Sequence, residues 1–74
     1  MKQLYRIEVF GRPGSGKTAR AMQIFERRVE LNLGTTVVDD NGYVADYTGK
    51  AESLHVLIVI READCGLTEI RFTK

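Results

Sequence analysis

The chain has 74 residues, of which 43% are hydrophobic and 28% charged, and its formal net charge is +1. This length allows a single domain, residues 1–74, with a small core. The balanced charge gives no strong attraction to nucleic acid or to a membrane surface. No apolar run approaches the about 20 residues of a membrane span, and the chain start does not have the pattern of a signal peptide. The single cysteine, Cys65, excludes an internal disulfide and favours a reducing, cytoplasmic compartment.

A strand and a helix are the first elements that the sequence predicts. Residues 4–10, LYRIEVF, read as a buried strand. From Thr18 to Leu33, hydrophobic side chains recur at steps of three and four, which predicts a helix over 18–33. Gly34 stands where a glycine commonly ends a helix. Basic residues on the polar face of this helix alternate with acids, which favours a solvated surface over a nucleic-acid patch.

A hairpin and two further strands complete the expected fold. Two short strands flank the turn sequence Asn41-Gly42, a strong hairpin signal, and a connector at 49–53 follows them. The apolar run LHVLIVI is typical of a central strand covered on both faces. The last segment alternates loosely and reads as an edge strand. The expected strands after the helix are 35–40, 43–48, 54–60 and 67–74.

The segment 11–18, GRPGSGKT, is the most informative part of the chain. It matches the phosphate-loop pattern G-x-x-x-x-G-K-[ST] at every fixed position, and it joins an expected strand to an expected helix. Glycines let backbone N–H groups turn inward around an anion, and the start of a helix adds positive partial charge. All eight residues are therefore expected to bind nucleotide: Gly11, Arg12, Pro13, Gly14, Ser15, Gly16, Lys17 and Thr18.

Two residues of this loop have expected chemical roles. Lys17 is expected to reach the β- and γ-phosphates and to assist catalysis as a point charge, and the Thr18 hydroxyl to ligate Mg²⁺. The expected cofactor is therefore Mg²⁺ with ATP or GTP. Which nucleotide is bound stays open.

Through GRPGSGKT the chain resembles the P-loop NTPase superfamily over roughly residues 4–64. The form of the loop is most similar to that of Zot-type and viral packaging ATPases. A second similarity lies in LIVIREAD, residues 57–64, which looks like the Walker B strand of the ATPase branch. There Glu62 matches the catalytic glutamate of the family. Arg61 occupies the position of the acid on the Mg²⁺ side, and a cation beside the metal predicts slow hydrolysis.

The acid that serves the metal is an open choice. Asp39 and Asp40 end the strand TTVV, and Asp39 is our first candidate metal ligand beside Thr18. The alternative is that these acids belong to the turn at Asn41-Gly42, where aspartate is favoured in any case. Glu62 is the candidate to orient water for hydrolysis, and its alternative is an ion pair with Arg61.

Four other residues have structural alternatives that outweigh functional ones. A single histidine, His55, makes a poor metal site. Tyr43 and Tyr47 lie four apart and are expected on one strand face, where packing is more common than base stacking. Cys65 has no neighbouring base in sequence and reads as a loop residue.

These observations predict an α/β fold: a minimal P-loop βα unit followed by antiparallel strands, in a small mixed sheet with one helix packed on it. A complete P-loop domain is about twice this size. The one helix expected here can cover only one face of the sheet, so the other face is left open. We expect a homo-oligomer or a protein partner to cover that face, with Arg12 or Arg61 of a neighbour acting on the nucleotide. The first functional hypothesis is a nucleotide-binding protein with weak Mg²⁺-dependent ATPase activity. The alternative is a small regulatory or inhibitory module of phage or mobile-element type that does not hydrolyse efficiently.

Overall fold

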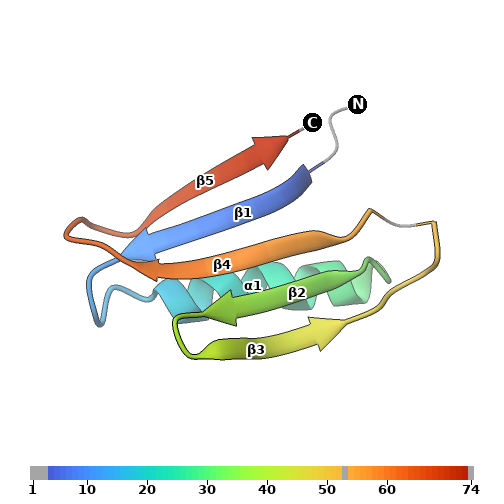
Figure 1. The fold of residues 1–74 in the computed structure, drawn as a ribbon, viewed down its shortest axis with the longest axis horizontal. Helices are drawn as coiled ribbons and strands as arrows, with labels where there is room; N and C mark the ends of the chain where they lie inside the picture. The colour runs from blue at the N-terminus through green and yellow to red at the C-terminus, as the bar shows by residue number, and fades with distance from the viewer. Residues whose placement is uncertain (1–3, 53, 74) are drawn as a thin grey trace.

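One helix packs on a five-stranded mixed sheet in the computed structural model, which describes residues 4–52 and 54–73 (Figure 1). This confirms the predicted fold class. Ser53 of the expected connector and Lys74 of the expected last strand lie outside the described residues. In chain order the elements are β1 (Leu4–Gly11), α1 (Lys17–Glu30), β2 (Thr35–Asp39), β3 (Gly42–Tyr47), β4 (Val56–Glu62) and β5 (Thr68–Thr73).

The strand order is β3-β2-β4-β1-β5, with three parallel strands at the centre. β4 pairs in parallel with β1 on one side and with β2 on the other, so that Ile58 lies between Ile7 and Val37. β3 and β5 are antiparallel edge strands. Because β1, β2 and β4 run in the same direction, their carboxyl ends meet at one edge of the sheet. The loop that follows β1 starts from this edge.

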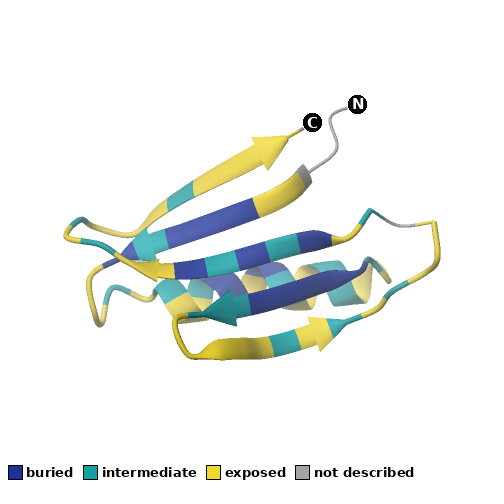
Figure 2. Ribbon diagram, in the orientation of Figure 1, coloured by how far each residue is buried: buried dark blue, intermediate teal, exposed yellow. Residues whose placement is uncertain are grey.

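The core lies between α1 and one face of the three parallel strands (Figure 2). Alternate strand residues face the helix, as the period of two requires. The helix contributes the buried side chains of Ala21 and Ile24, and the partly buried Phe25 packs against the core. The buried hydrophobic residues are Ile7, Val9, Ala21, Ile24, Val37, Val56, Ile58 and Ile60.

The helix ends at Glu30, three residues before the predicted end at Leu33. Asn32 has the positive φ, 58°, that breaks the helical path, and asparagine tolerates this conformation better than most residues. Gly34 is needed for a different reason than expected. A Cβ at Gly34 would lie 2.6 Å from the carbonyl oxygen of Thr48. Gly34 therefore allows the chain after the helix to pass close to the segment after β3.

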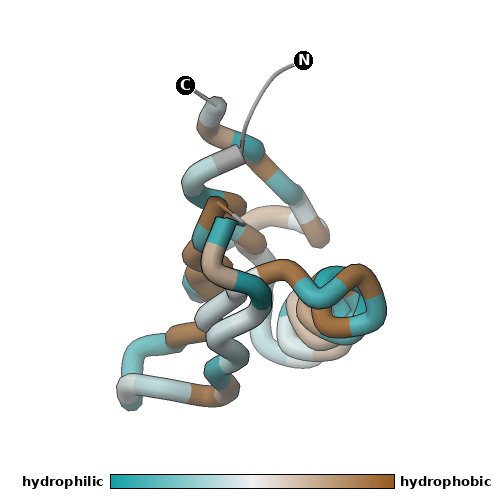
Figure 3. Tube along the Cα trace, turned by 90° about the vertical axis from the view of Figure 1, so that its right-hand side faces the viewer, coloured by the Kyte–Doolittle hydropathy of each residue, from teal (hydrophilic) through white to brown (hydrophobic). Residues whose placement is uncertain are grey.

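The second face of the sheet carries no helix within the described residues, as the side view in Figure 3 shows. The side chains of Leu57 and Val59 in the central strand are half-buried there. Glu8 is buried on this face although it is charged, and it forms ion pairs with Arg6 at 3.0 Å and Arg61 at 3.4 Å. This face therefore combines apolar side chains with a row of paired charges.

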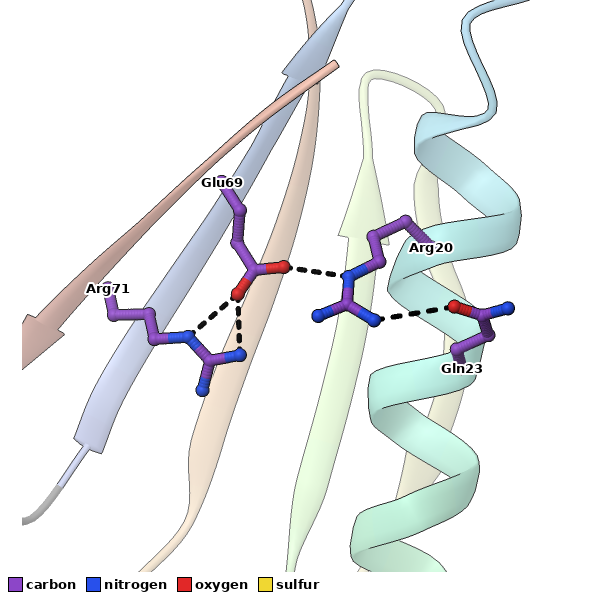
Figure 4. A network of polar contacts seen from close by, with 4 residues as sticks. All are labelled: Arg20, Gln23, Glu69 and Arg71. Carbon is purple, nitrogen blue, oxygen red and sulfur yellow. Dashed lines mark hydrogen bonds and ion pairs between the residues drawn. The ribbon is translucent and has the colours of Figure 1, made fainter.

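A carboxylate between two guanidinium groups ties β5 to α1 (Figure 4). Glu69 accepts a hydrogen bond from Nε of Arg20 at 2.8 Å and from Nε of Arg71 at 2.7 Å. Burial alone raises the pKa of Glu69, but the hydrogen bonds and charges of the two arginines outweigh it. The pKa of this carboxyl is thereby held below its ordinary value of 4.5.

We predict that Glu69 makes stability pH-dependent in acid. Because the pKa is lower in the folded than in the unfolded chain, the stabilisation is complete above about pH 4.5 and is lost as the pH falls through the folded value. Glu69→Gln should lower the free energy of unfolding by about 1–2 kcal/mol at pH 7, measured by urea unfolding. The difference from the natural sequence should shrink toward pH 3. A difference that stays constant from pH 7 to pH 3 would contradict this account.

Candidate functional site

The loop between β1 and α1 takes a conformation that needs glycine at two positions. Gly14 has a φ of 81° and Gly16 a φ of 91°, both in the left-handed region. A Cβ at either residue would meet no atom within 4 Å. The backbone conformation, and not lack of space, is therefore what requires glycine there.

Gly11 is required for space and not for a left-handed turn. Its φ is not positive, and it is the last residue of β1, opposite Glu62 of β4. A Cβ at Gly11 would lie 2.1 Å from Oγ of Ser15 and 3.1 Å from its Cβ. The loop thus folds back so that Ser15 rests on the end of its own strand.

Helix α1 begins at this loop without a side-chain cap. Gly16 occupies the N-cap position, no side chain caps it, and no acidic residue lies in the first turn. The amides of Lys17 and Thr18 belong to that first turn and lack an acceptor within the helix. The amide of Ser15 is used inside the loop, since it donates to the carbonyl of Arg12 at 3.0 Å. Uncapped amides and the positive end of a helix dipole favour a negative charge at this position.

The loop is braced by the turn between β4 and β5. The amide of Ala63 donates to the carbonyl of Gly11 at 3.0 Å, and the amide of Arg12 to that of Cys65 at 3.1 Å. The ion pair between Arg12 and Asp64, at 3.1 Å, is exposed on both sides and contributes little. This bracing was not predicted. It follows from the parallel pairing of β1 with β4, which places the loop after β1 beside the turn after β4.

Three stretches of the chain contribute to an open cavity of about 200 Å³ beside the loop. Lys17 and Thr18 come from the start of α1, Asp39 ends β2, and Glu62 ends β4. The structure thus brings together the residues that the sequence predicted for catalysis and metal binding. The full lining is Lys17, Thr18, Asp39, Asp40, Asn41, Ile60 and Glu62.

Both interpretations of Asp39 fit this geometry. Its Oδ1 accepts a hydrogen bond from the amide of Asn41 at 2.8 Å, which is the turn role. Its side chain also lines the cavity. The role in the turn therefore does not remove Asp39 from the site, since a carboxylate has a second oxygen.

Arg61 does not line this cavity, although the Walker B similarity placed it beside the expected metal. Ile60 and Glu62 line the cavity, and strand alternation turns the residue between them to the other face. There Nε of Arg61 lies 3.4 Å from Oε1 of Glu8. An ion pair with Arg61, the structural alternative for Glu62, is absent from the ion pairs of the described residues.

The donors in the cavity suit Mg²⁺ bound together with phosphate. Within residues 4–52 and 54–73, no three His, Cys, Asp or Glu side chains are placed to hold a metal by themselves. Magnesium usually takes one or two carboxylates, and completes its shell with water and substrate phosphates. The hydroxyl of Thr18 with the carboxylate of Asp39, Asp40 or Glu62 matches that donor set.

The two tyrosines lie on opposite faces of the sheet, and not on one face as expected. Tyr43 pairs with Val38, but Tyr47 pairs with Thr35, because the register shifts by one residue between them. The Tyr47 hydroxyl donates to Oδ1 of Asn32 at 2.7 Å. Tyr43 is 83% exposed on the open face. Neither tyrosine lines the cavity beside the loop.

His55 takes part in a hydrogen-bonded group away from the cavity. Its Nε2 lies 2.6 Å from Oγ1 of Thr36, which donates to Oδ1 of Asp46 at 2.6 Å. Cys65 acts through its backbone carbonyl, as described above, and its half-buried thiol is unpaired.

Comparison of the chain with protein-family models, with curated proteins and with solved structures found no match. No helix in the described part of the chain has the length and apolar character required to cross a membrane.

We predict that Ser15→Ala raises stability. Among the described residues, Ser15 Oγ is the one buried side-chain polar atom without a hydrogen-bond partner, and an unsatisfied buried hydroxyl costs about 1–3 kcal/mol. Thermal unfolding should show a higher melting temperature for the variant. Thr36→Ala is the matched control, because it removes a buried hydroxyl that has partners, and it should lower the melting temperature. Equal destabilisation by both changes would refute the prediction.

Proposed function

We propose that this protein binds a nucleoside triphosphate, ATP or GTP, together with Mg²⁺, through residues 11–18. The observation that supports this best is the uncapped start of α1 behind two left-handed glycines. A cation, a hydroxyl and three carboxylates surround the adjoining cavity. The cation suits the phosphate oxygens of a magnesium–triphosphate complex, and the hydroxyl and carboxylates suit its metal ion.

In this proposal the loop amides and Lys17 hold the phosphates. Nζ of Lys17 donates to the carbonyl of Arg12 at 3.4 Å, a long and weak hydrogen bond that a phosphate oxygen readily replaces. The Thr18 hydroxyl and the Asp39 carboxylate hold the metal. When bound, Mg²⁺ neutralises phosphate charge.

Hydrolysis by the isolated chain should be weak. Glu62 is our candidate to orient the attacking water. Thr18, Asp40 and Glu62 are all exposed at the mouth of the cavity, so bulk water screens the charges that stabilise the transition state. Exposure of the site, and not a cation at Arg61 beside the metal, is therefore the physical reason to expect slow hydrolysis. Arg61 is paired with the buried Glu8, whereas the ion pair of Arg12 with Asp64 is exposed on both sides and weak. Arg12 is therefore the better candidate to reach the nucleotide of a neighbouring subunit.

Lys17→Ala should weaken the binding of Mg²⁺-ATP at least tenfold, which corresponds to about 1.4 kcal/mol. Titration calorimetry measures this directly, and GTP serves as the second ligand. Lys50→Ala is the matched control, because Lys50 is an exposed lysine whose amide bonds to Asn32 near the other end of α1. Equal affinity of the Lys17 and Lys50 variants would exclude the loop as the site.

The same titration identifies the acids. Asp39→Asn keeps an oxygen that can accept the amide of Asn41, so the turn is preserved while the charge is lost. We expect it to abolish the gain in ATP affinity that Mg²⁺ produces, while Glu62→Gln keeps that gain and lowers phosphate release. If Asp40→Asn or Glu62→Gln abolishes the gain and Asp39→Asn does not, the metal ligand is one of those acids.

The alternative function, a small regulatory or inhibitory module of the kind found in phages and mobile elements, is favoured by the open sheet face. Three large side chains stand exposed there: Tyr43, Ile70 and Phe72 are 83%, 44% and 38% exposed. This module would bind a protein partner and would not hydrolyse nucleotide efficiently. Mg²⁺-ATP should then leave the melting temperature unchanged, whereas nucleotide binding raises it.

We also propose that a second copy covers this face and that the protein is a homodimer or a larger oligomer. A core this small gains stability from association. Multi-angle light scattering at micromolar concentration should give at least twice the monomer mass of 8.3 kDa. A monomer mass would contradict the proposal. We also propose a cytoplasmic location, because the proposed ligands and the free thiol both suit that compartment.

A further inference from the structure

A groove between α1 and β5 is lined by four arginines and is separate from the cavity beside the loop. Its volume is about 230 Å³. Its floor is formed by the buried side chains of Ile7 and Ile24. It shares no residue with the loop cavity, which lies toward β2 and β4. The polar residues that line the groove are Arg20, Gln23, Arg27, Arg28 and Arg71.

Positive charge in the groove exceeds the negative charge that balances it. Arg20 and Arg71 share a single carboxylate, that of Glu69. Arg27 pairs with Glu30 at 3.4 Å, but both side chains are about two-thirds exposed or more, at 72% and 67%. Water screens such a pair, so it neutralises little.

Arg28 has no carboxylate partner among the ion pairs of the described residues, although it is half-buried. Its guanidinium donates to neutral oxygens: to Oγ1 of Thr35 at 2.7 Å, and to the carbonyls of Gly34 and Leu54 at 3.2 and 3.0 Å. Burial lowers the pKa of Arg28. A partly buried cation without a counter-ion is costly, and a bound anion would reduce that cost.

The rim arginines are held in place with donors to spare. Figure 4 shows the guanidinium groups of Arg20 and Arg71 on either side of the Glu69 carboxylate, in the space between β5 and α1. Glu69 fixes each guanidinium through its Nε. In the part of the chain that the structure describes, Nη2 of Arg20 and Nη1 of Arg71 donate to no protein acceptor. These donors are therefore available to a ligand at little entropic cost.

We propose that this groove is a second anion site and that it binds a small phosphate monoester. Arg20 and Arg71 donate to the phosphate oxygens, and Arg28 supplies the charge behind them. A phosphate monoester carries nearly two negative charges and three acceptor oxygens, which suits several guanidinium groups better than a carboxylate does. The volume limits the organic part to a small group over Ile24, since drug-sized ligands need about 300 Å³ or more.

The test is a titration followed by amide chemical shifts, on the full chain carrying Lys17→Ala so that the loop site is weakened. The probes are phenyl phosphate and benzoate, which differ in the anionic group. Phenyl phosphate should shift amides of residues 20–28 and 69–71, and bind at least tenfold more tightly than benzoate. Arg71→Gln should weaken phenyl phosphate binding at least tenfold. The control is Arg61→Gln, which removes the same charge from the opposite face of the sheet and should leave the affinity for phenyl phosphate unchanged.

The proposal is overturned if the shifts are confined to residues 14–18, if benzoate binds as tightly, or if Arg71→Gln binds as well as Arg61→Gln. Should Arg71→Gln fail to fold, Arg27→Gln decides instead. The Arg27 side chain is 72% exposed, so its loss does not disturb the core, and binding should fall at least threefold. The outcome is independent of the proposed nucleotide site, which is tested with ATP on the chain that retains Lys17.

Discussion

The parallel pairing of β1 with β4 is the contact on which the rest of the structure depends. It places Ile7 and Ile58 together in the core, and it sets Gly11 opposite Glu62 at the edge of the sheet. The loop after β1 and the turn after β4 can brace each other only in this register. Because strand side chains alternate, a shift of one residue would turn Arg61 toward the cavity and Glu62 toward Glu8. Register thus determines whether an acid or a cation stands beside the loop.

Much of the fold and the candidate site could be predicted because the signals are local. The loop pattern, the hairpin turn and the apolar run of β4 each lie within a few consecutive residues. The end of α1 could not be predicted, because Asn32 and Gly34 both suit a helix end, and only packing against the segment after β3 separates their roles. The prediction that Tyr43 and Tyr47 share one strand face was wrong, because the sequence does not show the β-bulge that lies between them.

Contacts between distant segments explain the remaining omissions. Arg20 and Arg71 share Glu69 only because β5 folds back beside β1, and neither the helix nor the strand shows this alone. The composition likewise gives no indication that the arginines are gathered in one place. A net charge of +1 suggests an even surface, yet acids gather beside the loop and arginines gather in the groove on the β5 side of the molecule. The average charge of a small chain therefore says little about its individual surfaces.

The bulge in β3 also affects how the molecule can assemble. Val37 pairs with Ala45 and Val38 with Tyr43, so Val44 has no partner on β2. A bulge bends and twists an edge strand, which makes the edge a poor template for another strand. Extension of the sheet from one molecule to the next is therefore disfavoured on the β3 side. A chain that exposes apolar side chains on a sheet face thus has a built-in obstacle to open-ended, fibre-like growth at that edge.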